Sequence, residues 1–485
     1  EHSIRMDEDS TLSSDLQERL DNAGQLAKSA GDLFVSDQEG YVGDEITLMG
    51  RNFPADEQYD LTWHTVDGRW GVLQGYQITG TQYQPREVTI GTVQTNDDGR
   101  FDTAWTVPED FGGAHRIEIM SGDEPVARTE IEITPWFELE RTEAQLGESI
   151  ILRGYGLGPE VTHSNFQVSW DNGFLGFMTG VQNRGTATAA IRATGPPGEH
   201  VIQLWRNYRG VPFVANNTQS PLGSVGGDRQ NAWTVTVTPP DSPPETAWVD
   251  ELVDENPMEV HLLDLDADTD AELSITPQCG QAGTDAVITG QNFPAKETVD
   301  LLWYQHVGDG IRGINVTPQP RPEVLPTVTT DADGHFQIEV EIPPAEGSTR
   351  PIVAEVGGRS VAQTGFMMHP SVETFEPTSG PVGTEIEIEL SGIGWTAYES
   401  APYFVYDNKP LGYACGASED LRSPTVRTVL TASGEPGYHF IDVYPTIFEM
   451  DDDEPEFEIR PHLSYLDNHP VRPLSAAHLT FEITE

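Results

Sequence analysis

The chain has 485 residues, enough for three or four domains of ordinary size, each with its own hydrophobic core. It carries 79 Asp and Glu against 26 Lys and Arg, so its formal net charge of −53 repels the phosphate backbone of nucleic acids. No stretch approaches the roughly 18 apolar residues that span a bilayer. Composition therefore argues against a nucleic-acid partner and against membrane insertion.

The N-terminal segment, residues 1–31, predicts a short helix. Ser14 and Gln17 have the spacing of a capping box, and the apolar residues that follow share one helical face: Leu16, Leu20, Ala23 and Ala27. A helix of this length is unstable alone, so we expect it to dock on its own chain or on a neighbour. The chain begins at Glu1 rather than Met, which we interpret as a mature form that has lost an export signal.

From residue 32 onward, short runs of alternating apolar and polar residues predict half-buried strands. Ile46 and Leu48 show the alternation early in the chain, and Phe166 and Val168 show it later. Turn residues such as those at 171–173 separate the runs roughly every 8 to 12 residues, which is typical of a two-sheet β-sandwich.

These patterns divide the chain into modules of about a hundred residues. Module 1 covers residues 32–134, module 2 covers 135–240, module 3 covers 271–370 and module 4 covers 371–485. Residues 241–270 are acidic and contain prolines, so we interpret them as a linker, with one expected strand around residues 258–263.

Two pairs of similar stretches show that the chain is duplicated. Residues 50–63 and 290–303 read GRNFPADEQYDLTW and GQNFPAKETVDLLW, at an offset of 240. Residues 169–176 and 405–412 read SWDNGFLG and VYDNKPLG, at an offset of 236. The predicted fold is therefore all-β: four tandem sandwich modules, arranged as a duplicated two-module unit behind a short N-terminal helix.

The opening of modules 1 and 3 carries a family resemblance. Residues 40–53 read GYVGDEITLMGRNF and residues 280–293 read GQAGTDAVITGQNF, and a looser version spans 380–395. These stretches resemble the start of IPT/TIG-type immunoglobulin-like repeats of bacterial and archaeal extracellular and cell-surface proteins. The resemblance implies an immunoglobulin-like sandwich for each module and an extracellular location. It does not select one function, because such repeats act as spacers, stalks, sugar-binding appendages and coat subunits.

The two cysteines are candidates for a disulfide. In an immunoglobulin-like sandwich, the loop after the first strand would place Cys279 at the pole of module 3 that faces module 4. The strand after the turn at residues 407–408 would carry Cys415 back toward module 3. A bridge between them would suit an oxidising exterior, and two separate buried thiols are the alternative.

Acidic clusters and sequons are the other candidate sites. Aspartates alternate at Asp264, Asp266, Asp268 and Asp270, and a second group comprises Asp451, Asp452 and Asp453. Calcium or another cation is possible there, but the EF-hand glycine and final carboxylate are missing, so a solvated acidic surface is the alternative. No cofactor is predicted. Asn216 and Asn315 head sequons that would accept glycans on a surface protein.

Catalytic motifs such as Gly-x-Ser-x-Gly and His-Glu-x-x-His are missing from the sequence, so we expect no enzyme. His200 and His439 occupy matching positions, which favours a structural role. Modules 2 and 4 each carry a long insertion before their last strand, at residues 206–231 and 445–477. These could be docking surfaces or ordinary decorated hairpins; the contact candidates are Trp205, Tyr208, Arg209, Phe213, Phe448, Phe457 and Tyr465.

The chain has only three lysines beside its 79 carboxylates, a combination that resembles proteins from organisms of concentrated salt. We therefore expect an extracellular structural protein of a halophile-like organism, a subunit of a surface layer, sheath or filament that contacts copies of itself or another surface protein. The alternative is a monomeric secreted carbohydrate-binding or adhesion protein that stacks polysaccharide on Trp70, Trp205 or Tyr208.

Overall fold

The computed structural model describes most of the chain after residue 28. The described residues are 29–73, 77–159, 165–206, 229–251, 263, 265, 269–309, 314–321, 324–345, 347–393, 402–414, 425–446, 461–468 and 475–485. The chain divides into two compact units. Unit 1 comprises residues 1–71, 79–239 and 462–471, and unit 2 comprises residues 72–78, 240–461 and 472–485.

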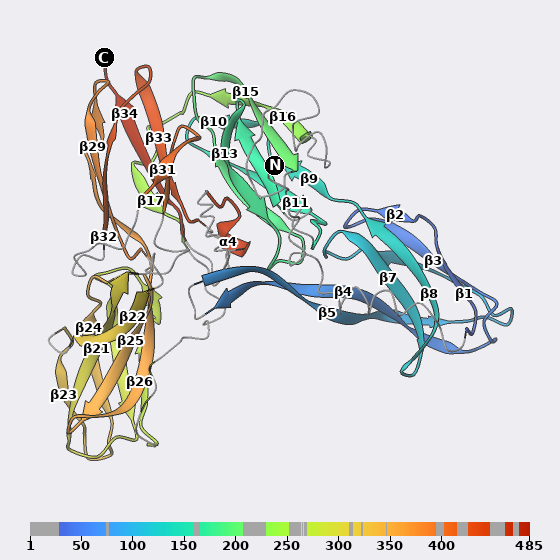
Figure 1. Cartoon of the computed structure of the whole chain (residues 1–485), viewed down its shortest axis with the longest axis horizontal. Helices are drawn as coiled ribbons and strands as arrows, with labels where there is room; N and C mark the ends of the chain where they lie inside the picture. The colour runs from blue at the N-terminus through green and yellow to red at the C-terminus, as the bar shows by residue number, and fades with distance from the viewer. Residues whose placement is uncertain are drawn as a thin grey trace, which may run out of the picture. The chain divides into compact units, whose positions relative to one another are not determined.

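Module 1 consists of two facing sheets (Figure 1). The three-stranded sheet has the order β1 (Asp32–Val35), β3 (Glu45–Arg51), β6 (Phe101–Thr106). The five-stranded sheet has the order β2 (Glu39–Gly40), β8 (Glu124–Ile133), β7 (Gly113–Ser121), β4 (Gln58–Leu73), β5 (Gln77–Gln94). The alternation along β3 turns Ile46 and Leu48 into the shared core, as the sequence predicts.

Module 2 repeats this arrangement. Its three-stranded sheet has the order β14 (Ala187–Arg192), β11 (Ser149–Tyr155), β9 (Trp136–Leu139). Its five-stranded sheet has the order β10 (Glu143–Gln145), β16 (Arg229–Thr238), β15 (Gly198–Arg206), β12 (Asn165–Trp170), β13 (Gly173–Thr179). Strand β13 is therefore the last strand of its sheet in the described part of the chain.

Module 3 pairs β18 (Glu272–Thr276), β20 (Asp285–Gln291) and β24 (Phe336–Glu341) in its smaller sheet. The larger sheet has the order β19 (Cys279–Gly280), β26 (Arg359–Met368), β25 (Ser348–Val356), β21 (Thr298–Asp309), β22 (Ile314–Arg321), with β23 (Thr327–Thr329) also paired to β21. Its core surrounds the buried indole of Trp303.

Module 4 pairs β27 (Ser371–Glu376), β29 (Glu385–Ser391) and β32 (Thr425–Thr431) in its smaller sheet. The larger sheet has the order β17 (Ala247–Val249), β34 (Ala477–Ile483), β33 (Gly437–Tyr444), β30 (Tyr403–Tyr406), β31 (Lys409–Tyr413), with β28 (Ser379–Gly380) also paired to β34. Strand β31 is the last strand of this sheet in the residues that the structure describes.

The strand order is that of an immunoglobulin-like sandwich in all four ranges. In each, a short strand pairs in parallel with the final strand: β2 with β8, β10 with β16, β19 with β26 and β28 with β34. This places the first strand on one sheet and its short continuation on the other. The predicted all-β fold class of packed sandwiches is confirmed.

The duplicated stretches encode the same packing. A Cβ at Gly50 would lie 2.0 Å from Cε1 of Phe101, and a Cβ at Gly290 would lie 2.0 Å from Cε1 of Phe336. Only glycine lets each ring lie flat against the strand, so the glycine and the distant phenylalanine must occur together. The similarity of the two stretches therefore reflects one packing arrangement that is used twice.

The expected N-terminal helix lies outside the described residues; the helix that the structure does describe is α4 (Tyr465–Asn468), in the module 4 insertion. No helix in the described ranges has both the length and the apolar character needed to cross a membrane.

Part of the linker forms a strand in the larger sheet of module 4. Its residues Ala247–Val249 form β17 and pair antiparallel with β34 of module 4. The strand expected at 258–263 falls almost wholly outside the described residues, and Leu263, the part that is described, is not in a strand. The linker thus completes a sheet whose other strands come from much further along the chain.

Candidate contact surface

The outer edge of strand β13 in module 2 is covered by a segment that lies far along the chain. This clasp segment, residues 462–468, belongs to the same compact unit as module 2 and comes from the insertion of module 4. Leu463 donates its N–H to the carbonyl of Phe177 at 2.7 Å, and His462 forms a parallel bridge with Phe177. The clasp segment therefore forms an isolated parallel bridge beside the edge strand, a contact of the kind that strand addition extends.

Side chains reinforce this contact. The buried imidazole of His462 stacks on the ring of Phe177, with 5.0 Å between centroids and 14° between planes. The Ser464 hydroxyl accepts the N–H of Thr179 at 2.9 Å and donates to the carbonyl of the same residue at 3.0 Å. One serine thus satisfies both backbone groups of Thr179 that an edge strand would leave to water.

Asn468, at the end of α4, connects the clasp segment to two modules. Its Oδ1 accepts the N–H groups of Gln182 at 3.0 Å and Asn183 at 3.2 Å, and its Nδ2 donates to the carbonyl of Thr186 at 3.1 Å. Its own carbonyl accepts the indole N–H of Trp70, in β4 of module 1, at 3.0 Å. The buried Asn468 therefore holds a loop of module 2 and a strand of module 1 together.

The corresponding edge strand of module 4, β31, is exposed. The pairing registers are equivalent and share the same bulge: Phe177 lies opposite Gln167 as Tyr413 lies opposite Tyr403, at matching positions of the duplicated sequence. Leu175 and Phe177 on β13 are 0% and 8% exposed, whereas Leu411 and Tyr413 on β31 are 54% and 51% exposed. An edge strand with outward apolar side chains is a template for pairing with another chain.

His200 and His439, the histidines at matching positions of the repeat, have a structural role. His200 shows it in module 2. His200 Nδ1 lies 2.6 Å from Asp171 Oδ2, and its Nε2 lies 2.8 Å from the Pro196 carbonyl. The second oxygen of the same carboxylate, Asp171 Oδ1, accepts the N–H of Val201 at 2.9 Å. The pair therefore fastens a hairpin turn to the neighbouring strand.

Module 4 repeats these contacts. His439 Nδ1 lies 2.6 Å from Asp407 Oδ2, its Nε2 lies 2.8 Å from the Glu435 carbonyl, and Asp407 Oδ1 accepts the N–H of Phe440 at 2.9 Å. Burial is the largest single influence and acts to lower the pKa of His439, but the hydrogen bond and the negative charge of Asp407, together with the hydrogen bond to Glu435, outweigh it and raise that pKa. The two histidines thus serve the same turn in the two copies.

A third histidine fastens the linker strand to module 4. His478, on β34, lies between two carboxylates: its Nδ1 is 2.7 Å from Asp442 Oδ1 and its Nε2 is 3.2 Å from Asp250 Oδ2. The indole of Trp248, on β17, stacks on the imidazole at 4.9 Å. Burial acts to lower the pKa of His478, but the hydrogen bonds to Asp250 and Asp442 outweigh it and raise the pKa to about 9.

The predicted contact residues fall in different places. Tyr465 lies in α4 and is buried inside unit 1, and Trp205 is half-buried at the end of β15. Trp70 is 8% exposed and donates to Asn468, so its ring is not an open stacking platform for a sugar. The remaining candidates lie outside the described residues: Tyr208, Arg209, Phe213, Phe448 and Phe457.

Of the other candidate sites, the structure describes only some residues. Cys279 lies in β19, opposite Met367 near the end of β26, but Cys415 lies outside the described residues, so their bridge stays a prediction. Asn315 lies in β22, and Asp270 is exposed. In the described ranges, no group of three or more His, Cys, Asp or Glu residues is arranged to hold a metal ion. Outside those ranges lie Asn216, Asp264, Asp266, Asp268, Asp451, Asp452 and Asp453.

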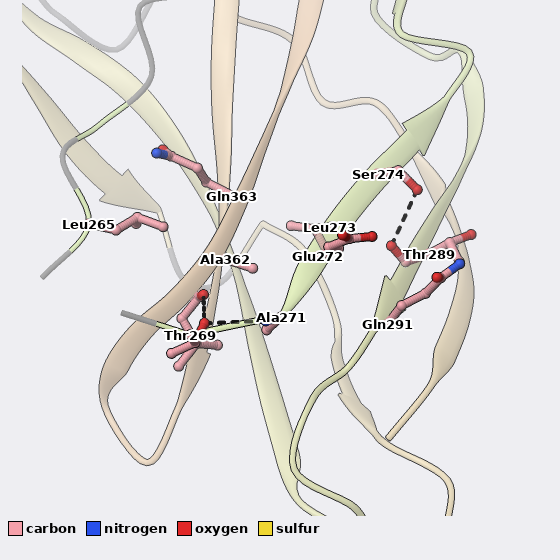
Figure 2. Close-up of a pocket in the computed structure, with 11 residues that line it drawn as sticks. Leu265, Thr269, Ala271, Glu272, Leu273, Ser274, Thr289, Gln291, Ala362 and Gln363 are labelled. Atoms are coloured by element: carbon pink, nitrogen blue, oxygen red, sulfur yellow. Dashed lines mark hydrogen bonds between the residues drawn. The ribbon is translucent and has the colours of Figure 1, made fainter. Parts of the chain in front are cut away.

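A pocket of about 450 Å³ lies in module 3, between the edges of its two sheets. Figure 2 shows Leu265 and Gln363 at one end and Ser274 and Gln291 at the other. The Thr269 hydroxyl donates to the Val361 carbonyl at 2.6 Å, so the end of the linker forms one wall. The lining includes no aromatic ring and Glu272 as its one ionisable side chain, which gives the pocket neither a sugar platform nor a pair of catalytic groups.

Sequence reasoning missed the residues that make the clasp contact, above all Ser464 and Asn468. Short polar residues inside a long insertion carry no periodic signal, so nothing in the local pattern marks them. The exposed face of β31 did have a signal: Leu411 and Tyr413 are two residues apart, and residues two apart share one face of a strand.

Comparison with known proteins adds little beyond the fold. No family model matches the chain, and no curated protein matches its sequence. Among solved structures, E. coli alpha-2-macroglobulin is similar over 92% of this chain and 31% of its own length, at 10% identity and a TM-score of 0.18. The D0-D1 domain of intimin is similar over 48% and 100%, at 14% identity and a TM-score of 0.14. The Yersinia pseudotuberculosis adhesin InvE is similar over 39% and 58%, at 13% identity and a TM-score of 0.17.

The chain thus spans less than a third of the length of the E. coli protein and somewhat more than half of the adhesin. At these identities and TM-scores, the likenesses carry no argument about function. The class of protein, a string of immunoglobulin-like sandwiches, stands on the strand order of the chain itself.

Proposed function

We propose that this protein is an extracellular structural protein, a subunit of a cell-surface layer, sheath or filament that acts through protein–protein contacts with its own copies. The observation that carries the proposal is strand β31, the last strand of its sheet in the described residues, which presents Leu411 and Tyr413 to solvent. In this proposal the modules are IPT/TIG-type repeats, and their role is to space and orient contact surfaces rather than to catalyse a reaction.

The titratable clusters support a non-catalytic role. His200 and His439 each engage a carboxylate and a backbone carbonyl of their own module, and His478 engages Asp442 and Asp250. In each of these histidines, both ring nitrogens lie within hydrogen-bond distance of an oxygen atom of the chain. A general base needs a nitrogen that can face a substrate, so these groups serve the sandwiches.

The charge of −53 supports an environment of concentrated salt, since at molar ionic strength the Debye length falls to about 3 Å and carboxylate repulsion is screened. The same screening would let copies of so acidic a protein approach each other. We therefore place the proposed assembly in a halophile-like organism.

Light scattering and negative-stain imaging in molar salt test this proposal. We expect ordered polymers of the purified chain at micromolar concentration. A monomer that is retained by a polysaccharide matrix would support the carbohydrate-binding alternative instead. A monomer that assembles only after a second surface protein is added would place the contact with a different partner and would contradict self-association.

A further inference from the structure

Two equivalent edge strands of this chain differ in one respect. Strand β13 of module 2 is covered by the clasp segment, whereas β31 of module 4 is the last strand of its sheet in the described residues. Because Phe177 and Tyr413 hold the same register position, the apolar surface that the clasp segment buries on β13 has a counterpart on β31.

The origin of the clasp segment suggests what covers β31. The clasp segment lies in the insertion between β33 and β34 of module 4, and module 2 has an insertion at the same place, between β15 and β16. Residues 461–464 read PHLS, and residues 212–215 in the module 2 insertion read PFVA. Both contain a proline, a ring, an aliphatic residue and a small residue, in that order, so the second stretch has the side chains for a clasp of the same kind.

Charge favours another copy of this protein as the surface that the module 2 insertion contacts. Residues 206–231 contain three arginines (Arg206, Arg209 and Arg229) and one aspartate (Asp228), so their formal charge is 3 − 1 = +2. The whole chain carries −53, which makes this insertion a basic segment on an acidic protein. Complementary charge steers association and sets the register of a contact, and attraction remains between groups that approach within the screening length.

We propose that residues 212–215 of one copy dock along β31 of a second copy, as the clasp segment docks along β13, with Phe213 over Tyr413 and Val214 beside the strand edge. This inference deepens the proposed self-association and rests on it. The donor lies in module 2 and the acceptor in module 4, so the contact is heterologous and can propagate into an open chain of copies.

Two variants break the contact from its two sides. Leu411→Asp places a charge on the acceptor strand, and Phe213→Asp removes the donor ring. We expect each to raise the concentration needed for half-maximal assembly more than about tenfold, as a change of over 1.4 kcal/mol per contact would. Val429→Asp is the matched control, because Val429 is also 54% exposed but lies on β32 of the other sheet of module 4. Circular dichroism and Tm in the same salt establish that all three variants fold.

Mixing the two variants makes the test decisive. Leu411→Asp keeps an intact donor and Phe213→Asp keeps an intact acceptor, so an equimolar mixture should form a one-to-one dimer that grows no further, visible by light scattering. If the wild-type chain assembles and both variants assemble equally well, the donor–acceptor contact is wrong while the proposed function stands. If the variants assemble poorly but their mixture gives no dimer, the contact is likewise wrong. A wild-type chain that is monomeric in molar salt, including one that covers β31 with its own insertion, would overturn both.

Discussion

At the scale of single residues, Asp467 is a carboxylate placed where the fold disfavours its charge. It lies half-buried in α4, and its Oδ1 accepts the side-chain N–H of Asn468 at 2.8 Å. Burial raises its pKa from 3.8 to about 6, and the hydrogen bonds from Asn468 and Asn183 only partly oppose that rise. The folded state therefore holds a proton that the unfolded chain releases between those two values, and the clasp segment docks better as pH falls through 6.

Asp467→Asn should remove this penalty. We expect the Tm of the variant to exceed that of wild type by a few degrees at pH 7.5. The difference should shrink as pH falls through 6 and vanish only below about pH 3.8, where the unfolded chain is protonated as well. Asp123→Asn, at an exposed turn in the same unit, is the control for simple loss of negative charge. Equal gains from both variants at pH 7.5 would mean that burial of Asp467 is not the cause.

His478 gives a pH dependence of the same sign in a higher pH range. Its pKa is about 9 in the folded state against 6.5 for the free side chain. The stability from its contacts with Asp442 and Asp250 is therefore complete below pH 6.5 and is lost as pH rises through 9. We expect the Tm of the transition that reports unit 2 to fall between pH 7 and 10.

His478→Gln should abolish that pH slope, because the amide does not titrate. It should also cost about 3–5 kcal/mol at pH 7, since the fully buried Asp442 carboxylate loses its charged partner. The exposed His335→Gln is the matched control and should keep the wild-type slope. A wild-type Tm that stays level from pH 7 to 10 would contradict the assignment.

At the scale of elements, the clasp segment depends on Asn468 more than on its short helix. Asn468→Ala leaves the N–H groups of Gln182 and Asn183 and the carbonyl of Thr186 without their partner, at about 1–3 kcal/mol for each group that stays buried. We expect the clasp segment to detach while the sandwiches remain folded. Hydrogen exchange of the Thr179 and Leu463 amides should accelerate together, and Leu466→Ala, at an exposed position of α4, should leave both unchanged.

Prediction from sequence succeeded for elements whose pattern is local. The alternation of Ile46 and Leu48 predicted β3, and the repeated stretches at residues 50–63 and 290–303 predicted that one module is used twice. It failed for β17, because Ala247–Val249 is too short a run to stand out from an acidic linker, and its partner β34 is the last strand of the chain. The sequence placed Tyr465 among the candidates for a contact surface, and the structure buries that ring inside unit 1.

At the scale of the whole molecule, the dominant quantity is the charge of −53. We expect dialysis from molar salt into dilute buffer to unfold the chain, because unscreened carboxylates repel one another more strongly in the compact state. Far-ultraviolet circular dichroism measures the loss of β-sheet. Sucrose screens no charge, so at equal osmolarity it should restore less β-sheet than the salt does. A full β-sheet spectrum in dilute buffer would argue against the halophile-like interpretation.

The second prediction at this scale concerns the connection between modules 3 and 4. We expect peptide mapping of the unreduced protein to find Cys279 joined to Cys415, and Cys415→Ser to lower Tm under oxidising conditions while leaving it unchanged under reducing ones. The stabilisation should be about 2–4 kcal/mol, the usual range for a bridge that closes a long loop. Recovery of both cysteines as alkylated thiols from oxidised material would rule the bridge out.

The sequence by itself determined the kind of building block and indicated its duplication, because strand alternation, turn residues and repeated stretches can be read from residues that are close in the chain. The tertiary structure alone decided which edges are covered. The Trp70–Asn468 hydrogen bond joins residues 398 positions apart, and β17 completes a sheet whose other strands begin beyond residue 400, apart from a two-residue strand at 379–380. Such pairings depend on how the folded modules position their edge strands. The residues next to each partner in the sequence give no information about that position.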